Sequence, residues 1–331
     1  MLSRAATSLA LLGRHLERAD NLARILSVHV ALSLDRADEP GASFWVRFME
    51  LAGWPASTVE RRDQAIEHIV TSPSGNSVRA SIAAARRAAQ AVRPSLPTEL
   101  YEQVNSLHWR VQGETWQRDL YPSLTDVQLT VRLVDGLLED TMSHDEARDF
   151  VRLGKFVERA ANVTTLVTHK AAELAEADDT LEWTAVLKCS FAFESYQSRY
   201  SAPVSPERVI EFLLLDTALP RSARFAAGVA LGSVSRIDAG GRRSRPRRLL
   251  ARLDSVLGQA DPSLVALHPR ELETHVRAVL RQLEVALRDT YFHPSKVSGT
   301  ILGDGGRALP QQQQQQSVGP ILTAASARQA P

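Results

Sequence analysis

A ten-residue segment that occurs twice constrains this chain more than any other feature. LGRHLERADN at residues 12–21 returns as LGKFVERAAN at residues 153–162, with six of the ten positions identical and no gap over the offset of 141 residues. A repeat at such a distance indicates duplicated structure. We therefore expect two related halves, 1–140 and 141–293, that share one polar motif.

The repeated segment has the pattern of a helix. Apolar residues recur at three- and four-residue steps through both copies, which predicts two long helices with one buried face each. In the first copy, Gly13, Glu17 and Asn21 step by four along one line, and Arg18 lies beside it. Glycine costs about 1 kcal/mol relative to alanine in a helix interior. Its presence in both copies therefore suggests the close approach of another backbone or of a ligand.

Two interpretations of this Glu-Arg motif stay open. If the two helices cross about a pseudo-twofold axis, Glu17 would reach Arg159 and Glu158 would reach Arg18, because buried charges need partners. Alternatively, the arginines clamp a carboxylate or phosphate group, and the glutamates orient them or bind an amine. The candidate ligand-binding residues of the second interpretation are Arg14, Glu17, Arg18, Asn21, Glu158, Arg159, Asn162 and Arg221.

Arg221 belongs to this set because of its neighbours in the sequence. Pro220 is typical of the first turn of a helix, and a helix start that carries Arg221 and Ser222 could hold an anion. Ordinary capping of the helix by Ser222 is the alternative.

The remaining pattern is also helical, with no convincing hairpin. Residues 143–146, Ser-His-Asp-Glu, have the pattern of a capping box at the start of the second long helix. We predict an all-α fold, a compact bundle of about twelve helices built from two duplicated six-helix halves. The composition after residue 293 is rich in Gln, Gly and Ser, which predicts a disordered tail over 294–331. The further helices are expected at 43–52, 57–70, 77–93, 98–111, 124–139, 181–199, 206–216, 221–234, 246–258 and 270–292.

Charge and composition exclude several classes of protein. The net charge of +1 gives no bias toward nucleic acid or a membrane surface. The basic run at 242–248 contains Pro246, so we expect a solvated loop there. No segment reaches the roughly 18 apolar residues of a membrane-spanning helix. The single cysteine, Cys189, suits a reducing cytoplasm and is expected to be a buried, inert thiol.

The sequence lacks the common motifs of catalysis and cofactor binding. It has no Walker loop, no dinucleotide-binding glycine pattern, no zinc-type Cys/His spacing and no Glu-x-x-His di-iron pattern. We therefore expect no cofactor and no metal, and the residues identify no catalytic group.

The chain resembles the Alpha-E family, a predicted all-helical domain named for its Glu-Arg motif. The resemblance covers nearly everything before the tail, so 1–293 is expected to form one Alpha-E domain. It rests on MLSRAATSLALLGRHLERADNLARIL, NSVRASIAAARRAAQAVR, TELYEQVNSLHW, EDTMSHDEARDFVRLGKFVERAANVTTLV and FLLLDTALPRSARF.

The resemblance implies an accessory role in a larger system. Members of the family typically sit beside, or are fused to, circularly permuted ATP-grasp proteins, with transglutaminase-like proteases nearby. These neighbouring proteins imply that a family member is a cytoplasmic, ligand-binding partner of an ATP-dependent carboxylate–amine ligase. The ligase would make or modify a peptide-like product. The ligand would be a small carboxylate- or amide-bearing molecule.

Two alternatives remain beside this accessory role. One is an enzyme of amide chemistry with Glu17 or Glu158 as general base, and the other is a purely structural scaffold. A binding site needs an open pocket at the motif, and an enzyme also needs a glutamate with a raised pKa. A scaffold should show closed Glu-Arg pairs without a cavity.

Overall fold

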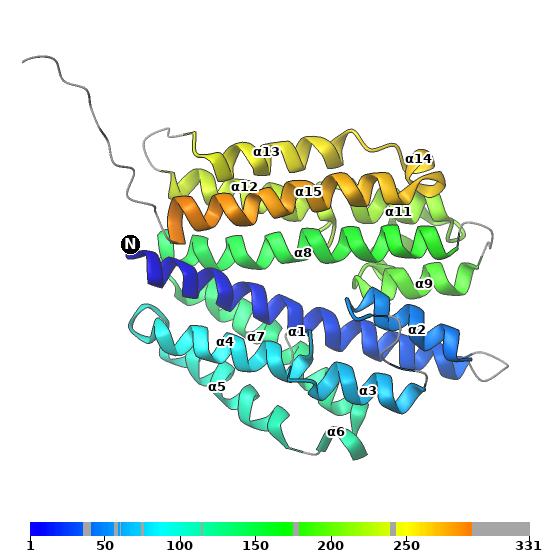
Figure 1. Ribbon diagram of the computed structural model, residues 1–331, viewed down its shortest axis with the longest axis horizontal. Helices are drawn as coiled ribbons and strands as arrows, with labels where there is room; N and C mark the ends of the chain where they lie inside the picture. Colours follow the sequence, from blue (N-terminus) through cyan, green and yellow to red (C-terminus); the bar gives the residue numbers. More distant parts are fainter. Residues whose placement is uncertain are drawn as a thin grey trace, which may run out of the picture. The chain divides into compact units, whose positions relative to one another are not determined.

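Two long helices carry the two copies of the repeated segment. They are α1 (Ser3–Asp35) and α8 (Glu146–Glu173), and they pack against each other in the computed structural model (Figure 1). The structure describes residues 1–35, 41–55, 59, 61–73, 76–113, 115–174, 179–238 and 243–292. Within these ranges every regular element is helical and none is a strand, which confirms the predicted all-α class. The predicted tail, 294–331, lies outside the described residues.

The backbones of α1 and α8 touch at the two repeated glycines. A Cβ atom added to Gly13 would lie 2.0 Å from the carbonyl oxygen of Val151, and one added to Gly154 would lie 1.9 Å from that of Ala10. The two contacts are reciprocal, because Ala10 and Val151 are separated by the same 141 residues as the two glycines. The expected close approach of another backbone is thus confirmed at both copies.

Three helices gather around α1. It packs against α4 (Val78–Ala91) and α7 (Leu120–Thr141), and α5 (Thr98–Gln112) completes the group by contacting both of these. This group is drawn in blue and cyan-green tones in Figure 1.

Three further helices gather around α8 in the same manner. It packs against α12 (Ala223–Ile237) and α15 (Pro269–Leu287), and α13 (Arg245–Gly258) contacts both of these (Figure 1). The shorter elements are α2 (Ala42–Leu51), α3 (Arg62–Thr71), η2 (Arg93–Ser95), α6 (Thr115–Arg118), α9 (Thr180–Cys189), α10 (Phe193–Tyr200), α11 (Pro206–Leu214), α14 (Pro262–Leu267) and the π-helical turn η3 (Arg288–Phe292).

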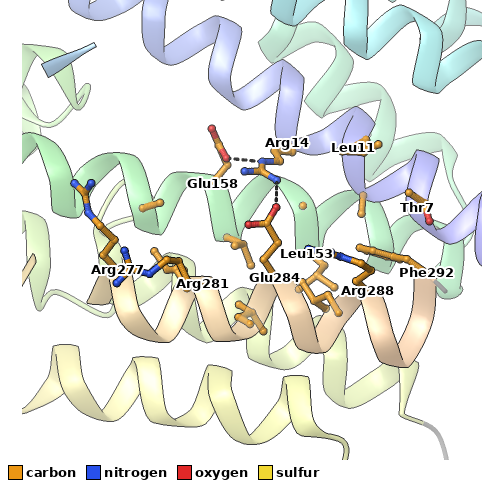
Figure 2. A pocket seen from close by; sticks show the side chains of 17 residues that line it. Thr7, Leu11, Arg14, Leu153, Glu158, Arg277, Arg281, Glu284, Arg288 and Phe292 are labelled. Carbon is orange, nitrogen blue, oxygen red and sulfur yellow. Dashed lines mark hydrogen bonds and ion pairs between the residues drawn. The ribbon is translucent and has the colours of Figure 1, made fainter. Parts of the chain in front are cut away.

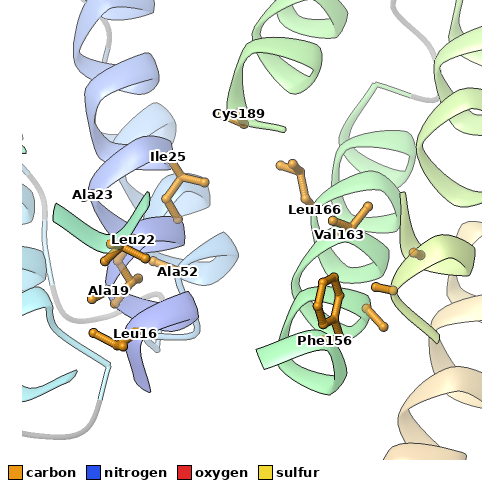
Figure 3. Packing of buried hydrophobic residues seen from close by; sticks show 14 of the residues in the cluster. Leu16, Ala19, Leu22, Ala23, Ile25, Ala52, Phe156, Val163, Leu166 and Cys189 are labelled. Atoms are coloured by element: carbon orange, nitrogen blue, oxygen red, sulfur yellow. The ribbon is translucent and has the colours of Figure 1, made fainter. Parts of the chain in front are cut away.

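Apolar side chains from nearly all of these helices form or contact one continuous core, and η2 is the exception among the described elements. Figure 3 shows part of it, with Leu16 and Ile25 on α1 and Phe156 and Leu166 on α8. Each fully buried side chain of this size contributes about 1.5–3 kcal/mol. Cys189 lies in the same core, where burial raises the pKa of its thiol to about 12, as expected for an inert cysteine.

Several predicted boundaries were wrong. The described residues contain fifteen α-helices rather than about twelve, because α6 and α14 were missed and the helix predicted at 181–199 is two helices. It breaks at Phe191, whose backbone φ of 50° cannot continue a right-handed helix.

Two predicted helix starts also need correction. The cap of α8 is Asp145, whose side chain accepts hydrogen bonds from the backbone N–H groups of Ala147 and Arg148, in place of the predicted capping box. The basic run does not stay in a loop, because α13 begins at Arg245 and Ser244 caps it. A proline tolerated in the first helical turn explains the second error.

The contact of the two backbones predicts that neither glycine tolerates a side chain. We expect Gly13→Ala and Gly154→Ala each to lower the free energy of unfolding by about 2–3 kcal/mol, because the added methyl group must push α1 and α8 apart. Urea denaturation measures this change. Gly136→Ala in α7 is the matched control, since its Cβ would meet nothing within 4 Å. It should be neutral or stabilise by up to about 1 kcal/mol. Unchanged stability of Gly13→Ala would contradict the close crossing.

Candidate functional site

The first motif copy forms a closed, buried ion pair. Arg159 donates two hydrogen bonds to the carboxylate of Glu17, from Nε to Oε1 and from Nη2 to Oε2, both at 2.7 Å. Its Nη1 donates to the carbonyl oxygen of Pro220 at 3.2 Å. The two side chains are only 6% and 4% exposed. The predicted pairing of Glu17 with Arg159 is therefore confirmed.

The electrostatics of this pair argue against a general base at Glu17. Burial favours the neutral acid, but the charge of Arg159 and its hydrogen bonds outweigh burial and hold the pKa of Glu17 well below its usual range. The carboxylate in turn raises the pKa of Arg159 against the effect of burial. A base with so low a pKa accepts protons poorly near neutral pH.

The second copy forms the reciprocal ion pair in a more open place. Glu158 accepts hydrogen bonds from Nε of Arg18 at 2.7 Å and from Nε of Arg14 at 3.0 Å. Arg14 also reaches Glu284 of α15, with 3.4 Å between Nη1 and Oε1 (Figure 2). The side chains of Arg14 and Arg18 are 38% and 20% exposed, in contrast to the buried first pair.

Two adjoining cavities open beside Glu158, between α1, α8 and α15. We call them together the motif cleft. The first has a volume of about 350 Å³ and the second about 330 Å³. Both are lined by Arg14, Glu158, Ala161, Arg277 and Leu280.

The two cavities of the motif cleft differ in chemistry. The first has a mainly apolar lining that includes Leu153 and Phe292, with Arg281 and Arg288 of the segment after Leu280 along one side (Figure 2). The second also has apolar residues in its lining, but it adds amide and hydroxyl side chains, namely Asn21, Asn76, Asn162, Thr164 and Thr165. The buried Nδ2 atom of Asn162 has no hydrogen-bond partner within the described structure.

Five of the eight predicted site residues line the motif cleft. They are Arg14, Arg18, Asn21, Glu158 and Asn162. The other three, Glu17, Arg159 and Arg221, line neither cavity and meet in the closed network of the first copy.

Arg221 lies just before α12, which begins two residues later than the sequence predicted, and it faces carboxylates of α1. Its Nη1 is 3.2 Å from Oδ2 of Asp20 and 3.6 Å from Oε1 of Glu17. Ser222 is the cap of α12 and accepts a hydrogen bond from the backbone N–H of Phe225, so the capping alternative is confirmed.

Sequence reasoning missed Asp20 and Arg24, which pair with each other and are buried. The comparison of the two copies could not find them, because the matching positions are Ala161 and Thr165. Their spacing of four residues was the available signal, since an acid and a base four apart face each other on a helix. The arginines of α15 were missed because only the packing brings them to the motif.

The part of the chain that the structure describes contains neither a cluster of metal-ligating side chains nor a membrane-spanning helix. There, no group of three or more His, Cys, Asp and Glu side chains is arranged to hold a metal ion. Among the same residues, no helix combines the length and the apolar character needed to cross a membrane.

The fold and the site together define a class: an all-helical protein centred on two crossed helices that exchange Glu-Arg pairs. The chain belongs to the Alpha-E family, whose model is described as a predicted alpha-helical domain with a conserved ER motif and matches residues 1–292. The family resemblance inferred from the sequence is thereby confirmed. No curated protein and no solved structure matches the chain significantly.

The buried first pair predicts a strong dependence of stability on both partners. We expect Arg159→Met to lower the free energy of unfolding by about 3–5 kcal/mol, because it removes both short hydrogen bonds to the buried carboxylate of Glu17 and leaves it only the longer contact with Arg221. The double variant Glu17→Met/Arg159→Met should recover much of this loss, since no buried charge then remains without a partner. Urea denaturation of the single and double variants measures both effects.

The matched control is Arg18→Met in the second copy. Glu158 then keeps Arg14 as a partner and lies beside the cleft, so the loss should be clearly smaller than for Arg159→Met. Equal losses for the two variants would contradict the division into a closed and an open pair.

Proposed function

We propose that this protein is a binding protein that holds a small carboxylate- or amide-bearing molecule in the motif cleft. We further propose that it serves a cytoplasmic ATP-grasp carboxylate–amine ligase system as an accessory, non-catalytic partner. One observation carries the binding role: a cavity adjoins the Glu-Arg pair of the second copy, whereas the pair of the first copy is closed and buried.

Three substitutions between the copies account for this difference in space. Asp20 of the first copy corresponds to Ala161 in the second, and Arg24 corresponds to Thr165. Asn76, at the start of α4, corresponds to Arg221, at the start of α12, over an offset of 145 residues. The large charged groups fill the first copy.

The three smaller counterparts line the motif cleft. Because these side chains are smaller, they leave space beside Glu158. The corresponding space beside Glu17 is filled by packed charged groups.

The lining of the cleft fits a ligand with both polar and apolar parts. The exposed arginines Arg277, Arg281 and Arg288 suit a carboxylate, and the amide groups of Asn21 and Asn162 suit a ligand amide. Most of the first cavity is apolar, as is usual for sites that enclose small molecules.

The two alternative functions receive unequal support. The low pKa of Glu17 disfavours the enzyme with that residue as general base. The closed pair of Glu17 and Arg159 favours a scaffold role, but only for the first copy. We therefore assign a structural role to the first copy and ligand binding to the second.

The partners are proposed from the family resemblance. Proximity to circularly permuted ATP-grasp proteins and transglutaminase-like proteins in the family suggests that one of each acts on the same peptide-like product. A cleft that accepts carboxylates and amides is compatible with such a product, because its substrates carry these groups.

We also propose that the two halves, 1–140 and 141–293, arose by duplication. The reciprocal contacts of Gly13 and Gly154 support this origin. So does the matching of each central helix with three others, α1 with α4, α5 and α7, and α8 with α12, α13 and α15. Even the supporting ion pairs match, since Asp135 of α7 binds Lys155 and Glu284 of α15 binds Arg14.

The binding role predicts that the protein retains a small molecule when it is purified from its own cells. Mass spectrometry of the denatured sample should detect a carboxylate- or amide-bearing compound, and the protein fraction should contain an ATP-grasp ligase. Ala161→Phe should lose the compound, because the new ring projects from a residue that lines both cavities.

Ala251→Phe is the matched control for this experiment. Its site is exposed on α13, outside the residues that line the cleft, so the compound should be retained. The binding role fails if wild type carries no compound, or if Ala161→Phe folds normally and carries the same amount. In that outcome the second Glu-Arg pair is structural like the first.

A further inference from the structure

A second cluster of charges lies on the closed side of the crossing, around Phe191. This residue sits in the turn between α9 and α10 with a backbone φ of 50°. A bulky residue in the left-handed region is strained, so the surrounding structure must hold it there. Its side chain is nevertheless 38% exposed. Strained backbone conformations of this kind cluster at functional sites.

Three arginines from three parts of the chain surround the ring of Phe191. The guanidinium carbons of Arg132, Arg24 and Arg221 lie 3.9, 4.1 and 5.2 Å from its centroid. Arg24 comes from α1, Arg132 from α7, and Arg221 precedes α12. We call these three residues the arginine cluster. Cation–π contact attracts each arginine to the ring, but the three positive charges repel one another.

The carboxylates nearby do not balance the positive charges. Asp20 contacts Arg24 and Arg221, and the other two acids, Glu17 and Asp135, bind Arg159 and Lys155. Five cations thus share three carboxylates, which leaves an excess of two positive charges. The five cations are Arg24, Arg132, Lys155, Arg159 and Arg221.

Arg132 is the one of these five cations that has no carboxylate partner within the described structure. Within the described structure its guanidinium makes no hydrogen bond or ion pair, and its Nη2 atom is buried without a partner. The Nε atom of the buried Arg24 also lacks a partner. A buried donor of this kind costs free energy until an acceptor reaches it.

The pKa values of all three arginines are lowered, as expected where positive charges lie together without enough negative charge nearby. Burial and the neighbouring charge of Arg221 lower the pKa of both Arg24 and Arg132. Burial and the charge of Arg159 lower that of Arg221 to about 10. An anion bound among these groups would oppose all three effects.

We propose that the arginine cluster is a second ligand site, which binds a phosphate dianion between Arg132 and Arg221. The ligand is inorganic phosphate or the phosphoryl group of a phosphomonoester. A phosphoryl group carries roughly 1.5 to 2 negative charges at neutral pH, and nearby arginines favour its dianion, which offsets the excess of positive charge. Its oxygens accept the paired hydrogen bonds that a guanidinium fork donates. This site is distinct from the motif cleft, whose lining includes none of the three arginines.

Isothermal titration calorimetry of the full chain tests this proposal. Inorganic phosphate and methyl phosphate are titrated separately, with chloride at matched ionic strength as the reference. We expect at least one of these two ligands to bind with a saturable isotherm that fits a single site. Arg132→Met should weaken binding at least about tenfold, because it removes charge-assisted hydrogen bonds to the ligand. Arg132→Lys keeps the charge without the fork and should give an intermediate affinity.

Arg252→Met is the matched control, because this exposed arginine of α13 lies outside the cluster and should leave the affinity unchanged. Equal affinities for the two ligands assign the site to the phosphate group itself. Tighter binding of methyl phosphate assigns it to a phosphomonoester. Absence of binding by both ligands overturns the proposal. So does a folded Arg132→Met protein with wild-type affinity.

Discussion

The contact between the backbones of α1 and α8 is the constraint on which the rest of the structure depends. Helices normally pack 8–10 Å apart because side chains separate them. Gly13 and Gly154 remove that separation at the crossing, each facing a carbonyl oxygen of the other helix. At this short range Glu17 and Glu158, one turn further along, each pair with an arginine of the opposite helix. The glycines and the ion pairs therefore act together at the contact between α1 and α8.

The two Glu-Arg pairs differ in burial because the residues around them differ. In the first copy, charged neighbours complete a buried network, and the cost of removing these charges from water is offset only by close pairing. In the second copy, Ala161 and Thr165 replace two of those neighbours, and the carboxylate of Glu158 borders the motif cleft. Smaller side chains around the second Glu-Arg pair thus leave space for a candidate binding site, whereas larger ones enclose the first pair.

The sequence predicted those features that both copies share and missed those that only one copy has. The helical class, the close approach at the glycines and the exchanged pairs follow from a pattern present twice, which filters out accidental similarity. Asp20 has no acidic counterpart, because Ala161 occupies the matching position, so the comparison of the two copies could not reveal it. Phe191, where the helix breaks, contacts arginines that are distant in sequence, and the edge of the cleft includes residues of α15. Such features arise from tertiary contacts, which periodicity cannot reveal.

The closed pair of Glu17 and Arg159 has a consequence for how members of this family can diversify. A protein tolerates new side chains at a site when the loss of stability they cause is absorbed elsewhere. Here the first copy holds the crossing in place without facing the cleft. The polar residues Asn21 and Asn162 beside the second copy are thus less constrained by the fold than the buried Glu17 and Arg159. If the second copy binds a ligand as proposed, changes in ligand preference can accumulate there while the first copy preserves the crossing, which a chain with only one copy of the motif would not permit.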